Sequence, residues 1–322
     1  MGVAAARHTS VDGILNFGGL SGTAFTGSTP AFSVLPVPYD LTASYISGMR
    51  NGPRAIIEAS THMELYDEEL DCEPYEAGIE TCAQMEATAL GPEEMIKRVR
   101  AAVSGIIAGG RIPVLLGGEH SITLGLVQAL LDKYPLLSVL QLDAHADMRD
   151  TYQDTPFNHA CVARRISELC PIVQVGIRSL CIEEAEFLKR GEKAGKNARI
   201  KTHYATDVLK GINWKDVVKD LTADVCITID LDVFDPAIMP ATGTPEPGGL
   251  LWHDVLSAVK ATAGSRRVVG FDVVELCPLP GVVAPDFLAA KLVYKMMAYV
   301  NASKNPGRSK PGRKRRQTAA FQ

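Results

Sequence analysis

The chain has 322 residues, 46% hydrophobic and 22% charged, a balance typical of globular proteins that excludes fibrous and low-complexity classes. Its formal net charge of -4 gives no reason to expect a nucleic-acid or membrane partner. The sequence has no apolar run of roughly 18 residues and no secretory leader. It therefore predicts a cytoplasmic protein that acts on small molecules.

The N-terminal residues 1–30 are rich in Gly, Ser and Thr, which predicts an irregular segment. Over residues 31–300, short apolar runs alternate with stretches of helical period, which indicates one α/β catalytic domain with a parallel sheet. The predicted strands are 32–36, 112–116, 136–142, 172–176, 225–231 and 268–274. The predicted helices are 92–108, 121–133, 161–169, 183–190, 253–263 and 285–300.

The composition changes sharply over residues 301–322. This segment carries seven Lys and Arg residues together with Pro and Gly, and it has no acidic residue. Such a composition predicts a disordered, solvated basic tail. A tether to an anionic partner is the alternative.

Polar side chains gather where three of the predicted strands end. The strand 112–116 is followed by Gly-Gly-Glu-His ending at His120, and the strand 136–142 by Asp-Ala-His-Ala-Asp over residues 143–147. The strand that starts at residue 225 leads into Asp230 and Asp232. Because the carboxyl ends of parallel strands line one edge of a sheet, the three clusters should meet there.

The residue types in these clusters indicate a metal centre. Alternate positions of an extended chain face the same way, so the spacing presents several ligands together. Four crowded carboxylates would repel one another unless cations neutralised them, and two divalent ions answer that need. Oxygen ligands with some imidazole suit manganese better than metals that prefer thiolates. The predicted ligands are His120, Asp143, His145, Asp147, Asp230 and Asp232.

These segments resemble the motifs of the ureohydrolases, a family that includes arginase, agmatinase and guanidinobutyrase. The similar segments are 117–121 (GGEHS), 142–147 (LDAHAD) and 228–236 (TIDLDVFDP), the last continuing to TGTP at 242–245. The resemblance implies a three-layer α/β/α fold with a central parallel sheet of about eight strands. It also implies two Mn²⁺ ions per subunit, release of urea from a guanidino substrate, and a homo-oligomer of three or six subunits.

Two further positions are similar to functional residues of that family. His159 resembles its proton-shuttling histidine and Glu275 its guanidinium-binding glutamate, while Asp143 and Asp230 resemble its bridging carboxylates. Both roles are physically reasonable, because a carboxylate pairs with the N–H donors of a guanidinium and an imidazole can protonate a leaving amine near neutral pH. A loop histidine and a solvated strand-end charge are the alternatives.

The expected reaction is attack by a metal-bridging hydroxide on the guanidinium carbon, which gives urea and an amine. The segment 150–162 lacks the Ser-Gly-Asn-x-His-Gly pattern of arginases, and the segments 143–150, 159–165 and 242–250 are similar to compact agmatinases. Agmatine, which would give putrescine, is therefore the first expected substrate. Guanidinobutyrate, arginine and guanidine are the alternatives, and a non-catalytic metal-binding regulatory partner is the remote one.

Overall fold

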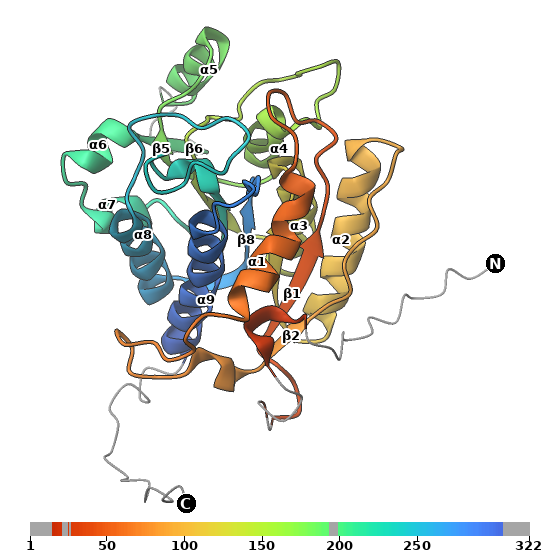
Figure 1. The fold of residues 1–322 in the computed structure, drawn as a ribbon. Helices are drawn as coiled ribbons and strands as arrows, with labels where there is room; N and C mark the ends of the chain where they lie inside the picture. The colour runs from red at the N-terminus through yellow and green to blue at the C-terminus, as the bar shows by residue number, and fades with distance from the viewer. Residues whose placement is uncertain (1–14, 21–24, 26, 193–198, 305–322) are drawn as a thin grey trace, which may run out of the picture.

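A central parallel sheet organises the fold (Figure 1). The computed structural model describes residues 15–20, 25, 27–192 and 199–304. Within them, eight strands pair in the order β2-β1-β3-β8-β7-β4-β5-β6, and every pair is parallel. They are β1 (Phe32–Val37), β2 (Ile79–Thr81), β3 (Ile112–Gly117), β4 (Ser138–Leu142), β5 (Ile172–Ile177), β6 (Ile200–Tyr204), β7 (Asp224–Asp230) and β8 (Arg267–Val274).

Helices cover both faces of this sheet. The α-helices are α1 (Gly52–Ser60), α2 (Pro92–Ala108), α3 (Thr123–Lys133), α4 (Val162–Leu169), α5 (Ile182–Glu192), α6 (Ala205–Leu209), α7 (Trp214–Val218), α8 (Trp252–Ser265) and α9 (Ala284–Lys304). The short 3-10 helices are η1 (Phe17–Gly19), η2 (Met49–Asn51), η3 (Pro74–Ala77), η4 (His120–Ile122), η5 (His159–Cys161) and η7 (Leu231–Val233).

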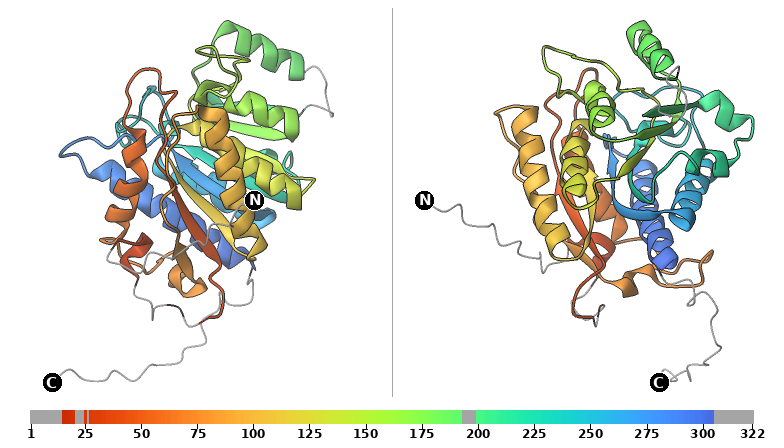
Figure 2. Two further views of the ribbon diagram at one scale, coloured as in Figure 1. Left: turned by 90° about the vertical axis from the view of Figure 1, so that its right-hand side faces the viewer. Right: turned by 180° about the vertical axis from the view of Figure 1, so that it is seen from behind.

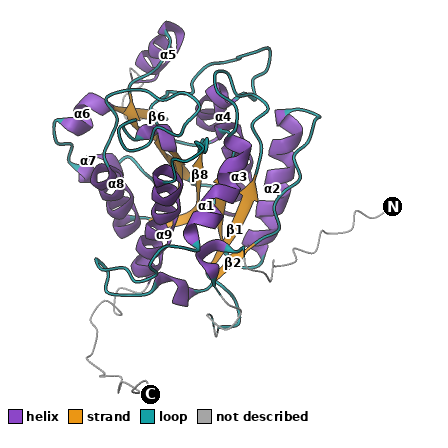
Figure 3. Ribbon diagram, in the orientation of Figure 1, coloured by secondary structure: helices purple, strands orange, loops and turns teal. Residues whose placement is uncertain are grey.

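The core is divided between the two faces of the sheet. Ile56 of α1 and Leu292 of α9 belong to the core cluster on one face, whereas Met95 of α2 and Leu126 of α3 belong to the cluster on the other. Figures 2 and 3 show the strands between these two groups of helices. The inner strands are buried and mainly apolar because helices cover both faces of the sheet. The predicted three-layer α/β/α fold with eight parallel strands is confirmed.

Two terminal regions differ from the sequence-based expectation. The last predicted helix, 285–300, continues through residues 301–304 at the end of α9, because nothing stops a helix before Pro306, and a proline disfavours helical backbone in the residue before it. The rest of the predicted tail lies outside the described residues. In the predicted irregular segment, Phe17 is buried in the core, and its N–H donates to Thr81 Oγ1 at 2.9 Å.

A buried ion pair attaches α9 to the loop that precedes η3. Lys295 is 3% exposed, and its Nζ lies 3.0 Å from Asp67 Oδ2 and 2.9 Å from Glu69 Oε2. Lys295→Met should lower the free energy of unfolding by about 3–5 kcal/mol, because the buried Asp67 would lose its cation. Urea denaturation measures this change.

Lys260→Met is the matched control for this prediction. Lys260 Nζ lies 2.5 Å from the other oxygen of Glu69, but its side chain is 56% exposed. An exposed ion pair contributes about 1 kcal/mol or less. Equal losses in the two variants would contradict the view that burial makes the Lys295 pair important.

No helix in the described part of the chain is long and apolar enough to cross a membrane.

Candidate metal centre and active site

Four neighbouring strands bring the predicted site residues to one edge of the sheet. These strands are neighbours in the order β3-β8-β7-β4. The chain leads from β3 to His120 and from β8 to Glu275. It leads from β7, whose last residue is Asp230, to Asp232, and from β4 to Asp143. All four positions follow the carboxyl ends of parallel strands, where open α/β sheets place their ligands. The predicted convergence of these segments is therefore observed.

His120, Asp143 and Asp147 form the first group that can hold a metal ion. His120 Nδ1 lies 3.2 Å from Asp143 Oδ2, 3.2 Å from Asp147 Oδ2 and 3.4 Å from Asp230 Oδ2. His120 is 1% exposed, and its Nδ1 has no hydrogen-bond partner in the described part of the chain. A buried nitrogen without a partner is costly. Its position between three carboxylates fits a cation bound by all of them.

Asp143, His145 and Asp232 form the second group. His145 Nδ1 lies 2.8 Å from Asp232 Oδ2 and 3.9 Å from Asp143 Oδ1. Asp143 thus presents Oδ2 to the first group and Oδ1 to the second, which is the arrangement of a bridging carboxylate. Asp230 Oδ1 accepts a hydrogen bond from the backbone N–H of Asp232 at 2.9 Å, which caps η7, while its Oδ2 lies 3.4 Å from His120 Nδ1.

Burial and like charges perturb the protonation of these groups. Burial raises the pKa of Asp143 to about 7, and the charges of Asp147 and Asp232 add to the effect. Burial alone would lower the pKa of His145, but the charge of Asp232 raises it to about 11. Without cations the site therefore holds protons, which divalent ions would displace. The donor set fits two divalent cations.

Glu275 follows β8 directly beside the first group. Its φ is +68°, a left-handed conformation that non-glycine residues seldom adopt, and Asp147 also has a positive φ of +52°. Glu275 N–H donates to the Gly118 carbonyl at 2.8 Å, and Glu275 Oε1 accepts from the N–H of His120 at 2.6 Å. Burial and the charge of Glu119 raise the pKa of Glu275. Such strained backbone is often retained at functional sites.

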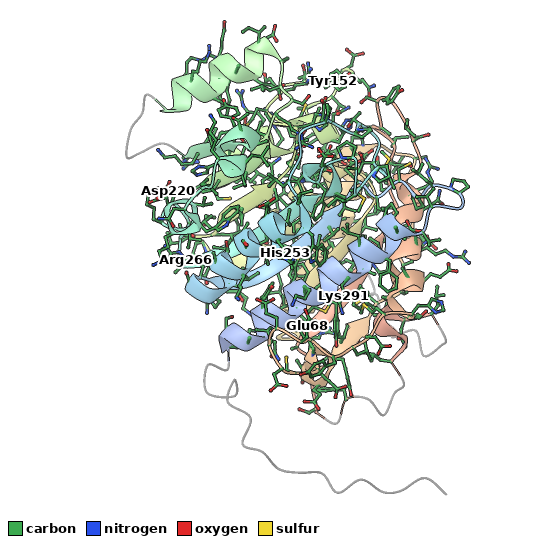
Figure 4. All side chains as sticks on the ribbon, turned by 60° about the vertical axis from the view of Figure 1, so that its left-hand side comes forward. Glu68, Tyr152, Asp220, His253, Arg266 and Lys291 are labelled. Carbon is green, nitrogen blue, oxygen red and sulfur yellow. The ribbon has the colours of Figure 1, made fainter. Side chains whose placement is uncertain are left out.

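His159 is the first residue of η5 and follows the loop that begins after Asp147. Its Nδ1 lies 3.1 Å from Thr42 Oγ1, and its Nε2 lies 3.5 Å from Ser44 Oγ. The ring of Tyr152 makes a T-shaped contact with the ring of His159. Tyr152 is labelled near the top of the molecule in Figure 4. Burial lowers the pKa of His159, which favours the neutral imidazole at pH 7.

Two residues that the sequence analysis did not single out support the second group. Arg178, after β5, donates to the carbonyl of Asp232 at 2.6 Å and to that of Glu246 at 2.8 Å. Glu246 Oε1 accepts from Ser179 Oγ at 2.8 Å and lies 3.8 Å from His145 Nε2. The sequence offers a signal for Arg178, because it directly follows the end of β5 at the same edge of the sheet as the candidate metal ligands. A cavity of about 300 Å³ opens beside His145 and Asp147.

Glu119 and Thr42 also emerge only from the structure. Glu119 is completely buried within the Gly-Gly-Glu-His segment, and burial raises its pKa to about 7 although hydrogen bonds from Ser121 and Thr42 lower it. Thr42 lies in the loop after β1, where no sequence pattern marks it. All eight residues predicted for the site, the six in the metal groups together with His159 and Glu275, lie at this edge.

Comparisons with known proteins identify the family of this chain. A model of the arginase family matches residues 30–298. The N(1)-aminopropylagmatine ureohydrolase of Synechocystis sp. is 40% identical over 278 residues, which cover 84% of this chain and 89% of that protein. The agmatinase of Pyrococcus horikoshii is 36% identical over 266 residues, which cover 82% and 89%.

The fold leads to the same group of proteins. The crystal structure of agmatine ureohydrolase of Thermoplasma volcanium superposes with a TM-score of 0.76 at 31% identity. The superposition covers 86% of this chain and 92% of that chain.

Proposed function

The chain belongs to the arginase family and is a ureohydrolase that acts on linear guanidino compounds, and we propose that its substrate is agmatine or N(1)-aminopropylagmatine. The observation that carries the proposal is the Glu275 carboxylate, held by the N–H of His120 beside the first metal-binding group. The absence of the arginase pattern in segment 150–162 favours a substrate without an amino-acid end. The aminopropyl derivative is included because relatives of that name reach 40% identity.

The chemistry requires a nucleophile, a guanidinium holder and a proton donor. Two divalent ions, proposed to be Mn²⁺ because the ligands are carboxylates and imidazoles, would supply hydroxide by lowering the pKa of water from 15.7 to about 7. Glu275 orients the planar guanidinium through paired charge-assisted hydrogen bonds. The proposed ligands are His120, Asp143 and Asp147 with Asp230 in one group, and His145 and Asp232 with Asp143 in the other.

His159 completes the reaction. A C–O bond forms at the guanidinium carbon, the C–N bond to the substituted nitrogen breaks, and that nitrogen receives a proton from the imidazole. Urea and the free amine leave. The proton comes from the O–H of the attacking oxygen. The lowered pKa of His159 keeps its imidazole neutral before the reaction, so that it can take up this proton and pass it to the leaving nitrogen.

A panel of guanidino compounds tests the substrate. We expect urea release from agmatine and N(1)-aminopropylagmatine with a kcat/KM at least about tenfold above that for arginine or guanidinobutyrate, which is about 1.4 kcal/mol of discrimination. The reason is that the carboxylate end of the last two compounds would approach a site rich in acidic groups. The measurement is urea release by the Mn²⁺-loaded protein, with chelator-treated protein as the control.

The outcomes separate the alternatives. Absence of urea from every compound would favour the non-catalytic metal-binding protein, and a preference for arginine or guanidinobutyrate would overturn the agmatine assignment. The cytoplasmic location and the homo-oligomer of three or six subunits stay predictions.

A further inference from the structure

The buried Glu119 carboxyl group lies at the site, and the proposed reaction gives it no task. Glu119 Oε2 accepts from the backbone N–H of Thr42 at 2.6 Å. Glu119 Oε1 accepts from Thr42 Oγ1 at 2.8 Å and from Ser121 Oγ at 2.5 Å. All three hydrogen bonds run toward the carboxylate, which fits an ionised group that only accepts.

The Thr42 hydroxyl transmits this constraint to His159. A hydroxyl has one proton and two lone pairs. Its proton goes to Glu119, because a hydrogen bond to a carboxylate is the stronger one, and one lone pair accepts the backbone N–H of His159 at 3.1 Å. Only a lone pair remains for His159 Nδ1, which lies 3.1 Å away. That nitrogen must therefore donate, so it carries a hydrogen.

We infer that Glu119 and Thr42 hold neutral His159 in the tautomer with its proton on Nδ1, so that Nε2 is the atom that exchanges a proton with the substrate. The other groups near the ring are compatible with this assignment, because the Ser44 hydroxyl, 3.5 Å from Nε2, can donate to that nitrogen and Tyr152 makes only a T-shaped ring contact. Thr42 and Glu119 are thus positioning residues. The statement that Nε2 exchanges a proton with the substrate rests on the proposed function. The assignment of the Nδ1–H tautomer does not rest on it.

The tautomer is directly measurable by NMR of protein labelled with ¹⁵N-histidine and loaded with Zn²⁺, which is diamagnetic. The His159 signals are identified by their loss in His159→Asn. We expect a protonated Nδ1 and an unprotonated Nε2 in the wild type at a pH above the pKa values of both His159 and Glu119, where the imidazole is neutral and the carboxylate is ionised. A wild-type spectrum with the proton on Nε2 would overturn the inference.

Two variants test the cause of this tautomer. Thr42→Val keeps the shape and the backbone N–H that binds Glu119 but removes the hydroxyl, so the preference for Nδ1–H should be lost. Thr42→Ser restores a hydroxyl and should restore the wild-type spectrum. Unchanged spectra in folded Thr42→Val would show that the hydroxyl does not set the tautomer.

Glu119→Gln offers an independent test that reverses the direction of the hydrogen bonds. The N–H of Thr42 requires an acceptor at the Oε2 position, so the glutamine NH₂ must occupy the Oε1 position and donate to the hydroxyls. Thr42 would then turn its proton toward His159 Nδ1, and the proton of the imidazole should move to Nε2. A spectrum that still shows Nδ1–H in this variant would contradict the proposed relay.

Kinetics separate the inference from the proposed function. Thr42→Val should lower kcat for urea release by about 10²-fold, within the range contributed by a positioned proton donor, with KM and metal content unchanged. Thr42→Ser should recover most of the loss. If the protein shows the Nδ1–H tautomer but releases no urea, the proposed function is wrong and the tautomer assignment stands. If Thr42→Val has a normal kcat, Thr42 does not position His159 for proton transfer.

Discussion

Asp143→Ala is expected to reduce urea release below detection and to remove bound metal. Asp143 is the residue shared by both groups, with Oδ2 3.2 Å from His120 Nδ1 and Oδ1 3.9 Å from His145 Nδ1. It is completely buried, and both of its oxygens are also fixed by hydrogen bonds, from Gln141 Nε2 at 2.7 Å and from the N–H of His145 at 2.6 Å. Its loss would deprive both proposed ions of a ligand at once.

The measurement is metal content by elemental analysis after dialysis, alongside urea release. Asp224→Ala is the matched control, because Asp224 begins β7 at the end of the strand opposite to Asp230 and pairs with Arg267 at 2.5 Å. This variant should keep its metal and its rate. Two bound ions and normal turnover in Asp143→Ala would refute the dinuclear site.

The interior of the sheet was predictable because burial imposes a simple pattern. β3, β4 and β7 are buried on both faces and mainly apolar, and their predicted ranges differ from the observed ones by one or two residues at the ends. The edge strands β2 and β6 were not predicted. β2 has only three residues, and β6 carries Lys201, Thr202 and His203, which are partly exposed because an edge strand has one neighbour.

Helix α1 was missed for a local reason. It begins with Gly52 and Pro53 after Asn51, residues that indicate a turn, although Pro is well tolerated in the first turn of a helix. The helix forms because Ile56 and Ile57 pack into the core. Tertiary packing thus overrides the turn signal.

The two groups that could hold metal ions were predictable from sequence, whereas the residues around them were not. Each predicted ligand follows a buried strand at short spacing, so the topology of a parallel sheet is enough to bring them together. Thr42 lies 77 residues from Glu119 and 117 from His159. Its contacts depend on how the loop after β1 crosses the site, and no local pattern encodes that path.

Glu275→Gln distinguishes guanidinium hydrolysis from other dinuclear metal chemistry. The glutamine keeps the volume of the side chain and an oxygen that can accept from the N–H of His120. In the wild type this N–H lies 2.6 Å from Glu275 Oε1. It loses the negative charge that matches the substrate cation. Because Glu275 is 6% exposed, the lost contact should be worth about 2–5 kcal/mol. This corresponds to a fall in kcat/KM of roughly thirtyfold to several thousandfold.

Metal content decides what such a fall means. Glu275 has no place in either metal-binding group, so the variant should keep the wild-type amount of manganese, unlike Asp143→Ala. Glu80→Gln is the control, since Glu80 is a carboxylate on the edge strand β2 that accepts from Ser33 Oγ at 2.8 Å; its rate and metal content should not change. If Glu275→Gln keeps both its manganese and nearly full activity on agmatine, Glu275 does not hold the guanidinium, and the substrate proposal loses its main support outside the metal-binding groups.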